Sequence, residues 1–198
     1  MTTLDLKKGE TLILSKEVSI DNLVFAGGWD QADAGQKDVD VDLVVVFLGA
    51  NGKPLVADGN LDTLNELKQT AVYFGKKKSD CGSIVHGGDN LTGKGDGDDE
   101  SIKVNLATLP SNIEGLILIA TIFDATAKGQ DFTKVKNEYV RILDVANNKE
   151  IKFTTDFGAE ETFEAVRVTR SPEGWVLNAI GAAVDGELIK YINGLLAA

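Results

Sequence analysis

Short stretches rich in β-branched and aromatic residues dominate the chain, and most are bounded by glycine, asparagine, aspartate or proline. Stretches of this kind are typical of β-strands. We predict nine of them: Thr11–Leu14, Leu23–Phe25, Leu43–Leu48, Ile102–Leu106, Leu116–Phe123, Glu138–Leu143, Glu150–Thr154, Phe163–Thr169 and Trp175–Ile180. Residues 147–149 and 171–174 contain the asparagine, proline and glycine that supply the dihedral angles of tight turns. We therefore expect hairpins there and antiparallel pairing.

Three segments show the apolar spacing or the acidic cap of a helix: Leu61–Lys68, Asp131–Val135 and Asp185–Leu195. They are too few and too scattered for the strand and helix alternation that builds a parallel sheet. The pattern predicts a mainly β fold, an antiparallel two-sheet β-sandwich with a few short helices. A partly closed barrel is the alternative. No proline-rich or serine-rich linker is present, so we expect residues 1–198 to form a single domain.

The chain is strongly acidic, with a formal net charge of -11 and a pI near 4.5. Proteins that bind nucleic acid need clustered lysine and arginine to release counterions from phosphates. Nucleic acid and acidic membranes are therefore not expected partners. The surplus of carboxylates suits a cation or a basic protein surface, although acidity alone also serves solubility.

Targeting and redox signals are sparse. The first residues lack an apolar targeting segment, and the longest apolar run, Leu43–Leu48, is too short to span a bilayer. We therefore expect a cytoplasmic protein without a transmembrane segment. Cys81 is the single cysteine and His86 the single histidine, which excludes an internal disulfide and a Cys/His zinc site. Trp29 and Trp175 are expected to pack in the core or against turns.

The composition changes between His86 and Glu100, where five glycines and five acids occur together. We call residues 89–100 the acidic loop; it carries five acids and one lysine. Such crowding of negative charge calls for a counter-charge, and calcium takes six to eight oxygen ligands from carboxylates and carbonyls. Glycine lets the backbone turn tightly enough to present those carbonyls. The alternative is a solvated acidic loop without a ligand.

Three known motifs match this region superficially and fail. An EF-hand loop needs oxygen ligands at positions 3 and 5 and glycine at position 6, where this chain has Leu91, Gly93 and Lys94. A phosphate-binding P-loop needs serine or threonine where this chain has Gly95. His86 begins an esterase-like His-Gly-Gly, but no G-x-S-x-G nucleophile motif exists. We therefore do not expect an enzyme.

A second group of acids occupies alternate positions at Asp38, Asp40 and Asp42. In a strand these side chains project from one face, about 7 Å apart, and repel one another unless a positive charge lies beside them. The preceding segment 27–35 is rich in glycine, and we expect it to be flexible and able to bring Asp30 to the same place. The alternative for Asp38–Asp42 is an edge strand protected by charge.

The order of several motifs resembles the TerD-type tellurium-resistance and stress-response family. The motifs that carry the resemblance are Leu6–Glu10, Gly28–Asp30, Asp40–Asp42, Gly82–Glu100, Ile122–Ala125, Gln130–Phe132, Val140–Ile142, Gly174–Trp175 and Ala179–Gly181. The resemblance implies a calcium-binding β-sandwich. Carried over by position, the implied metal residues are Asp30, Asp40, Asp42, Asp89, Asn90, Thr92, Gly95, Asp98, Asp99 and Glu100.

The resemblance and the acidic pattern together predict a non-enzymatic scaffold or sensor of the stress response, with Ca²⁺ held between the acidic loop and the Asp38–Asp42 strand. The expected partners are the calcium ion and other stress-response proteins. A cyclic-nucleotide-binding module is the alternative that relatives suggest, although Lys76–Lys78 is the one basic cluster that could meet a phosphate. A metal-dependent hydrolase, in which a bound cation activates water, is a third possibility.

Overall fold

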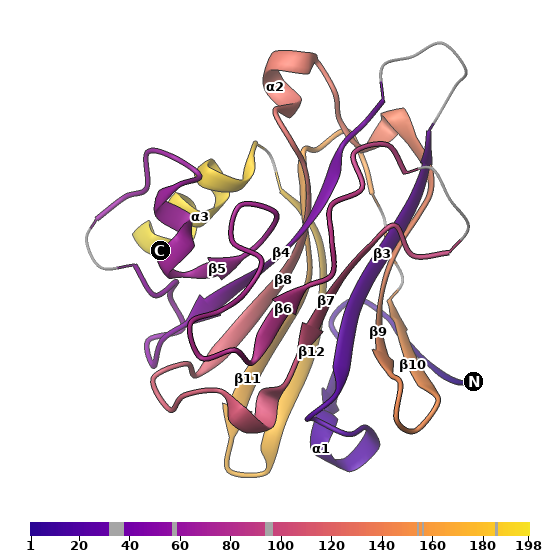
Figure 1. Cartoon of the computed structure of the whole chain (residues 1–198), viewed down its shortest axis with the longest axis vertical. Helices are drawn as coiled ribbons and strands as arrows, with labels where there is room; N and C mark the ends of the chain where they lie inside the picture. Colours follow the sequence, from indigo (N-terminus) through magenta and orange to yellow (C-terminus); the bar gives the residue numbers. More distant parts are fainter. Residues whose placement is uncertain (32–37, 57–58, 94–96, 154, 156, 185) are drawn as a thin grey trace.

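The computed structural model consists of two six-stranded β-sheets packed face to face (Figure 1). It describes all residues except 32–37, 57–58, 94–96, 154, 156 and 185. Sheet A has the strand order β1 (Thr2–Leu6), β10 (Lys149–Phe153), β9 (Val135–Asp144), β3 (Leu23–Gln31), β7 (Glu100–Val104) and β6 (Ile84–His86). Sheet B has the order β2 (Thr11–Ile13), β12 (Gly174–Val184), β11 (Thr162–Ser171), β8 (Gly115–Ile122), β4 (Val41–Leu48) and β5 (Ala71–Val72). The predicted β-sandwich is confirmed.

Neighbouring strands pair antiparallel in both sheets, with one exception: β1 runs parallel to β10. Both predicted hairpins are confirmed, between β9 and β10 and between β11 and β12. Their turns contain Asn148 with φ of 52° and Gly174 with φ of 114°. Asparagine and glycine tolerate this left-handed backbone region better than other residues, which explains their presence there.

All nine predicted strands are found, but their limits differ in two places that matter for the site. Strand β3 continues to Gln31 through Gly27 and Gly28, which the sequence analysis treated as part of a flexible segment. Both glycines pair with β9, and a Cβ on Gly28 would lie 2.7 Å from the hydroxyl oxygen of Tyr139. The expectation of flexibility was therefore wrong for residues 27–31, because close packing selected these glycines. Strand β4 begins at Val41, so Asp40 precedes it.

The remaining elements are short: α1 (Leu14–Glu17), η1 (Glu66–Gln69), η2 (Leu106–Thr108), α2 (Ala125–Lys128), η3 (Phe132–Lys134) and α3 (Leu188–Ala197), where η marks a 3₁₀ turn. The predicted helix at 131–135 is confirmed as η3, and the Asp131 carboxylate caps it by accepting from the Thr133 N–H. The predicted C-terminal helix is confirmed as α3, although the expected start at Asp185 lies outside the described residues.

The predicted helix over 61–68 is wrong, because η1 is the helical part of this segment. The backbone N–H and carbonyl of Leu61 both hydrogen-bond to the side chain of Asn193 on α3. The Glu66 carboxylate accepts from the backbone N–H of Asp62. The bond from Asn193 to the Leu61 carbonyl occupies the acceptor that a helix starting at residue 61 would use for its first turn.

Apolar side chains fill two layers. The larger cluster lies between the sheets, and a second cluster lies between the outer face of sheet B and the segment that includes α3. Strand β4 is buried along its whole length, which explains why its sequence is a continuous apolar run and not an alternating one. The middle of the outer face of sheet A, in front in Figure 1, is not covered by a described helix. No described helix is long and apolar enough to cross a membrane.

Candidate metal centre

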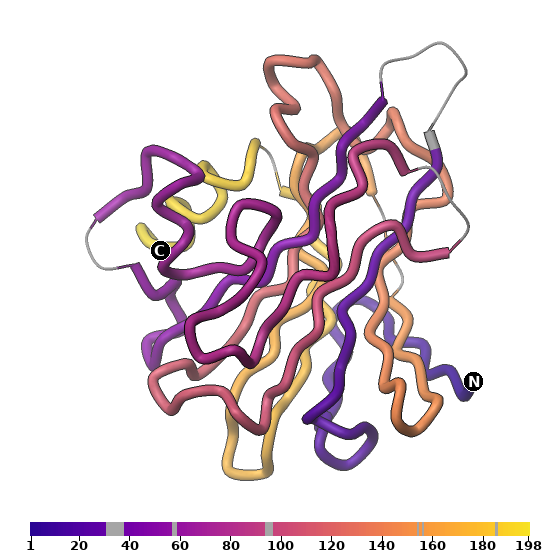
Figure 2. The backbone as a smooth tube through the Cα atoms, in the orientation of Figure 1, coloured from indigo at the N-terminus to yellow at the C-terminus, as the bar shows by residue number. Residues whose placement is uncertain are grey.

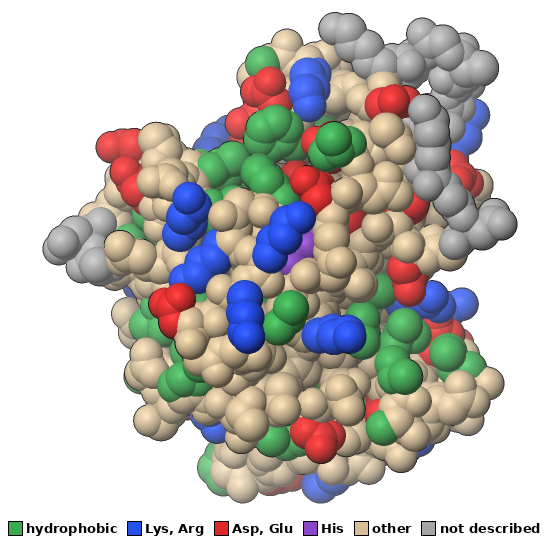
Figure 3. All heavy atoms as spheres, in the orientation of Figure 1, with side chains coloured by type: hydrophobic (Ala, Val, Ile, Leu, Met, Phe, Trp, Pro, Cys, Tyr) green, Lys and Arg blue, Asp and Glu red, His purple; other side chains and the backbone are tan. Residues whose placement is uncertain are grey.

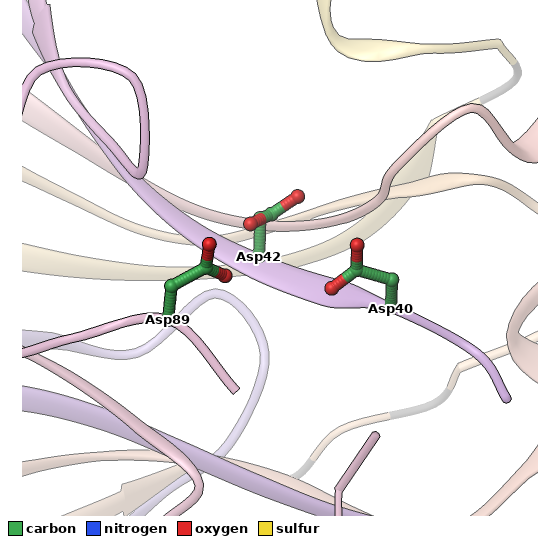
Figure 4. Close-up of side chains that lie close together, drawn as sticks. All are labelled: Asp40, Asp42 and Asp89. Carbon is green, nitrogen blue, oxygen red and sulfur yellow. The ribbon is translucent and has the colours of Figure 1, made fainter. Parts of the chain in front are cut away.

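Two acidic segments that lie far apart in the sequence meet beside the start of β4. Asp42 is the second residue of β4 and Asp40 lies just before it, held by a hydrogen bond of 2.9 Å from the Phe123 N–H to the Asp40 carbonyl. Asp89 lies in the acidic loop between β6 and β7, and Figure 2 shows the two chain segments running beside each other. Carboxylate oxygens of Asp40, Asp42 and Asp89 lie within 4.8 Å of one another. Figure 4 shows these three side chains, two of them on the segment that leads into β4 and one on the acidic loop.

We call these three side chains the carboxylate cluster. Asp42 is 2% exposed, and burial is the main reason that its pKa is raised to about 9, with the Glu100, Asp40 and Asp89 carboxylates adding to the shift. Burial and the Asp89 carboxylate raise the pKa of Asp40 to about 6, although the Lys128 ammonium opposes this shift. The cluster therefore brings three carboxyl groups together where burial and their mutual repulsion disfavour ionisation, which Lys128 offsets in part.

The cluster fits a hard divalent cation by its donors and its spacing. Two ligands at about 2.4 Å from one calcium ion are at most about 4.8 Å apart, and each pair of these carboxylates meets that limit. One oxygen of Asp40, Oδ1, is buried and has no hydrogen-bond partner among the described residues. Buried polar atoms are nearly always paired, so this oxygen is suited to a bound ion.

Glu100 lies close to the carboxylate cluster and next to His86. Glu100 is buried at the start of β7, and its Oε2 accepts from the Leu43 N–H at 2.8 Å. His86 Nδ1 accepts from the Gly88 N–H, so the ring proton is on Nε2, which lies 3.5 Å from Glu100 Oε2. The Glu100 carboxylate thus ties the end of the acidic loop to β4. It lies close enough to raise the pKa of both Asp40 and Asp42.

Trp29 packs in the core, as predicted, and it also connects the two acidic segments, a role that the sequence analysis missed. The indole is buried, and its Nε1–H donates to the Val39 carbonyl at 3.1 Å. The backbone N–H of Trp29 donates to Asp99 at 2.9 Å, and the other Asp99 oxygen accepts from the Asn90 side chain at 2.8 Å. The glycine and aspartate on either side of Trp29 identified this position as part of a motif. The hydrogen-bond partners of Trp29 lie 10 and 70 residues away, so the sequence did not indicate them.

The remaining oxygen of Asn90 shapes the turn of the loop. Asn90 Oδ1 accepts from the backbone N–H groups of Thr92 and Gly93, at 3.1 and 3.2 Å. Gly93 has a φ of 57°, and a Cβ there would lie 2.4 Å from the Trp29 indole nitrogen. Glycine is thus required at this position both by the backbone and by the packing of Trp29.

Asp98, a predicted metal residue, is bound by protein groups instead of lying in the carboxylate cluster. Arg141 donates to both Asp98 oxygens at 2.9 Å, and Tyr139 donates its hydroxyl to Asp98 at 2.9 Å. Arg141 also pairs with Glu150 at 2.7 Å. Planar, bidentate pairs of this kind are among the stronger surface interactions. The structure thus gives Asp98 a role in fastening the acidic loop to sheet A.

We expect Asp98→Asn to lower the free energy of unfolding by about 1 kcal/mol, because it removes a bidentate ion pair that is only partly buried. Urea unfolding measures this change, with Asp5→Asn as a control that removes an exposed charge from β1. We also expect Asp98→Asn to reduce calcium affinity less than Asp40→Asn does. An equal loss of affinity in the two variants would show that Arg141 releases Asp98 to the ion.

The other predicted metal residues are placed as follows. Asp30 is exposed on β3, and its carboxylate accepts from the Asn137 side chain at 2.8 Å. The Thr92 hydroxyl contacts Asn90 Oδ1 at 3.3 Å within the turn. Gly95 lies outside the described residues. The predicted set therefore divides into the carboxylate cluster, residues that hold the loop in place, and Asp30.

Together, the fold and the site define a β-sandwich protein that positions a cluster of three carboxylates, one of them buried, between a strand and a glycine-rich loop. The chain belongs to the TerD family: the model of the TerD domain matches residues 1–194.

Relatives with descriptive names agree with this assignment. General stress protein 16U of Bacillus subtilis is 36% identical over 95% of this chain and 94% of its own length. Tellurium resistance protein TerD of Alcaligenes sp is 33% identical over 94% of this chain and 93% of its own. The crystal structure of a homologue of telluride resistance protein (TerD) from Streptomyces coelicolor A3(2) superimposes with a TM-score of 0.69 at 18% identity, covering 88% of this chain and 96% of that one. This structural similarity, at 18% sequence identity, supports the fold alone.

Proposed function

We propose that this protein is a calcium-binding, non-enzymatic component of the stress response, acting in the cytoplasm as a scaffold or sensor. The observation that carries the proposal is the convergence of Asp40, Asp42 and Asp89 from two distant segments. Asp42 in particular is buried and forms no ion pair within the described part of the chain, although the Lys128 ammonium acts on it from a distance. The names of the relatives describe stress response and tellurium resistance, and those cited above do not name a reaction.

A cation at the carboxylate cluster would act as a cross-link between β4 and the acidic loop. Without it, the carboxylates of Asp40 and Asp89 repel each other, and this repulsion favours separation of the loop from the strand. With it, the loop surface that carries Leu91, 57% exposed, is fixed in place. We propose that this change in loop order is what other stress-response proteins detect.

Calcium is a better candidate than magnesium for this cluster. The three ligands include the deeply buried Asp42, which has to meet an ion that has lost most of its water. Magnesium gives up its water reluctantly and demands near-octahedral geometry, whereas calcium accepts irregular sets of carboxylates and carbonyls.

Titration calorimetry with calcium and with magnesium tests the proposal. Because both segments supply ligands, we expect Asp40→Asn and Asp89→Asn each to weaken calcium binding by more than about tenfold. Asp5→Asn makes the same change in charge at an exposed position on β1 and should leave affinity unaltered. Wild-type affinity in both cluster variants would refute the site, and tight binding that survives Asp89→Asn alone would confine it to Asp40 and Asp42.

A further inference from the structure

Five residues lie side by side across the outer face of sheet A. Lys78 is bridged to Val85 of β6, Val85 pairs with Lys103 of β7, Lys103 with Val24 of β3, and Val24 with Leu143 of β9. Directly paired residues in adjacent antiparallel strands project their side chains from the same face. We call this set the lysine–valine row. With strands about 4.8 Å apart, the row extends over roughly 19 Å.

The apolar members of the row lie on a face that is open to solvent. Val85, Val24 and Leu143 are each partly exposed, whereas their neighbours along the strands, such as Ile84 and Ile102, are buried in the core. The exposed face of an antiparallel sheet normally carries polar residues. Valine and leucine aligned across three strands are therefore unexplained by the packing of this chain.

The lysines of this region are not neutralised by the protein. Lys76 pairs with Asp80, but Lys77, Lys78 and Lys103 are exposed and form no ion pair with a carboxylate in the described part of the chain. Figure 3 shows blue side chains gathered over β5, β6 and β7, with green side chains between them. In a chain with a net charge of -11, this is a local reversal of sign.

We propose that the lysine–valine row is a docking surface for an acidic segment of a partner protein that carries aliphatic residues between its acids. The lysines attract the acids, and Val85, Val24 and Leu143 supply the apolar contact area that gives a protein interface its core. This surface lies outside the carboxylate cluster, so the proposal does not depend on calcium binding.

Charge favours a protein segment over other anionic partners. Binding of nucleic acid commonly uses six to ten phosphate contacts, more than the three unpaired lysines of this region provide. A membrane surface or a second copy of this chain presents extended negative charge, and the net charge of -11 opposes both approaches. A short acidic segment contacts only the positive region.

A synthetic peptide tests the docking surface. In this peptide serine alternates with glutamate or valine, so that the extended chain presents glutamate and valine on one face. We expect it to shift the backbone amide NMR signals of β6, β7 and β3 in the full-length protein. The double variant Lys78→Glu/Lys103→Glu should weaken binding by about tenfold, because two attractions become repulsions.

A matched control separates local from overall charge. Lys7→Glu/Lys8→Glu makes the same change in net charge at exposed residues beyond β1, the opposite edge strand, and should alter binding by less than about twofold. Equal weakening by both double variants, or shifts that lie outside the row, would overturn the proposal. Binding to phosphatidylserine vesicles or duplex DNA without binding to the peptide would also overturn it, as would self-association that occupies the row.

Discussion

We expect excess calcium to raise the melting temperature of the wild-type protein by roughly 5–11 °C relative to the same protein in chelator. A ligand that binds only the folded state stabilises it by about 2.7 kcal/mol at a hundredfold excess over its Kd. For a chain of this size each kcal/mol shifts the melting temperature by about 2–4 °C. The gain has a structural cause, since the ion attracts the carboxylates of Asp40, Asp42 and Asp89 and offsets the repulsion between Asp40 and Asp89. Scanning calorimetry measures it.

The variant Asp42→Asn gives this experiment its control. Because the pKa of Asp42 is raised to about 9, its carboxyl group is mainly protonated at neutral pH in the metal-free protein. Asparagine has nearly the same shape and is also neutral, so the variant should melt within about 2 °C of the wild type in chelator. It should lose most of the calcium-dependent gain, because the buried anionic ligand is gone. A calcium-dependent shift as large as that of the wild type would exclude Asp42 as a ligand.

The fold was predictable from the sequence to the extent that local pattern determines it. The long strands have continuous or alternating apolar residues and clear turns at their ends, as at Asn148 and Gly174. The two-residue strand β5 and the three-residue strand β6 exist through pairing with distant strands, which a local pattern does not record. The helical pattern at 61–68 failed for the same reason, since Asn193 engages the backbone of Leu61.

The site was predictable in part, and the division follows the range of the interactions. The alternation of acidic and apolar residues predicted that Asp40 and Asp42 share one face, and the structure brings their carboxylates together. Asp38, the third acid of the pattern, is exposed and lies outside the cluster. The bidentate pair of Asp98 with Arg141 spans 43 residues, so sequence spacing gave no signal for it. Charge density along the chain predicted a bound cation, but not which acids the protein itself neutralises.

Calcium affinity should rise by about tenfold per pH unit between about pH 6 and about pH 8. In this range Asp40 is mainly ionised but Asp42 still carries a proton, given pKa values raised to about 6 and about 9. Each calcium ion must therefore displace about one proton, and affinity follows the concentration of the deprotonated site. Calorimetric titrations in two buffers with different heats of ionisation count that proton directly.

The stability of the metal-free protein should change with pH in the opposite direction. Both folded-state pKa values lie above the ordinary value of 3.8, so the folded chain binds more protons than the unfolded chain. The contribution of these two groups to the free energy of unfolding is therefore complete below about pH 4 and is lost as pH rises through about 6 and about 9. Calcium should abolish this loss, and the gap between the calcium and chelator melting curves should widen with rising pH. A constant gap, together with no proton release, would mean that Asp42 is already ionised without the metal.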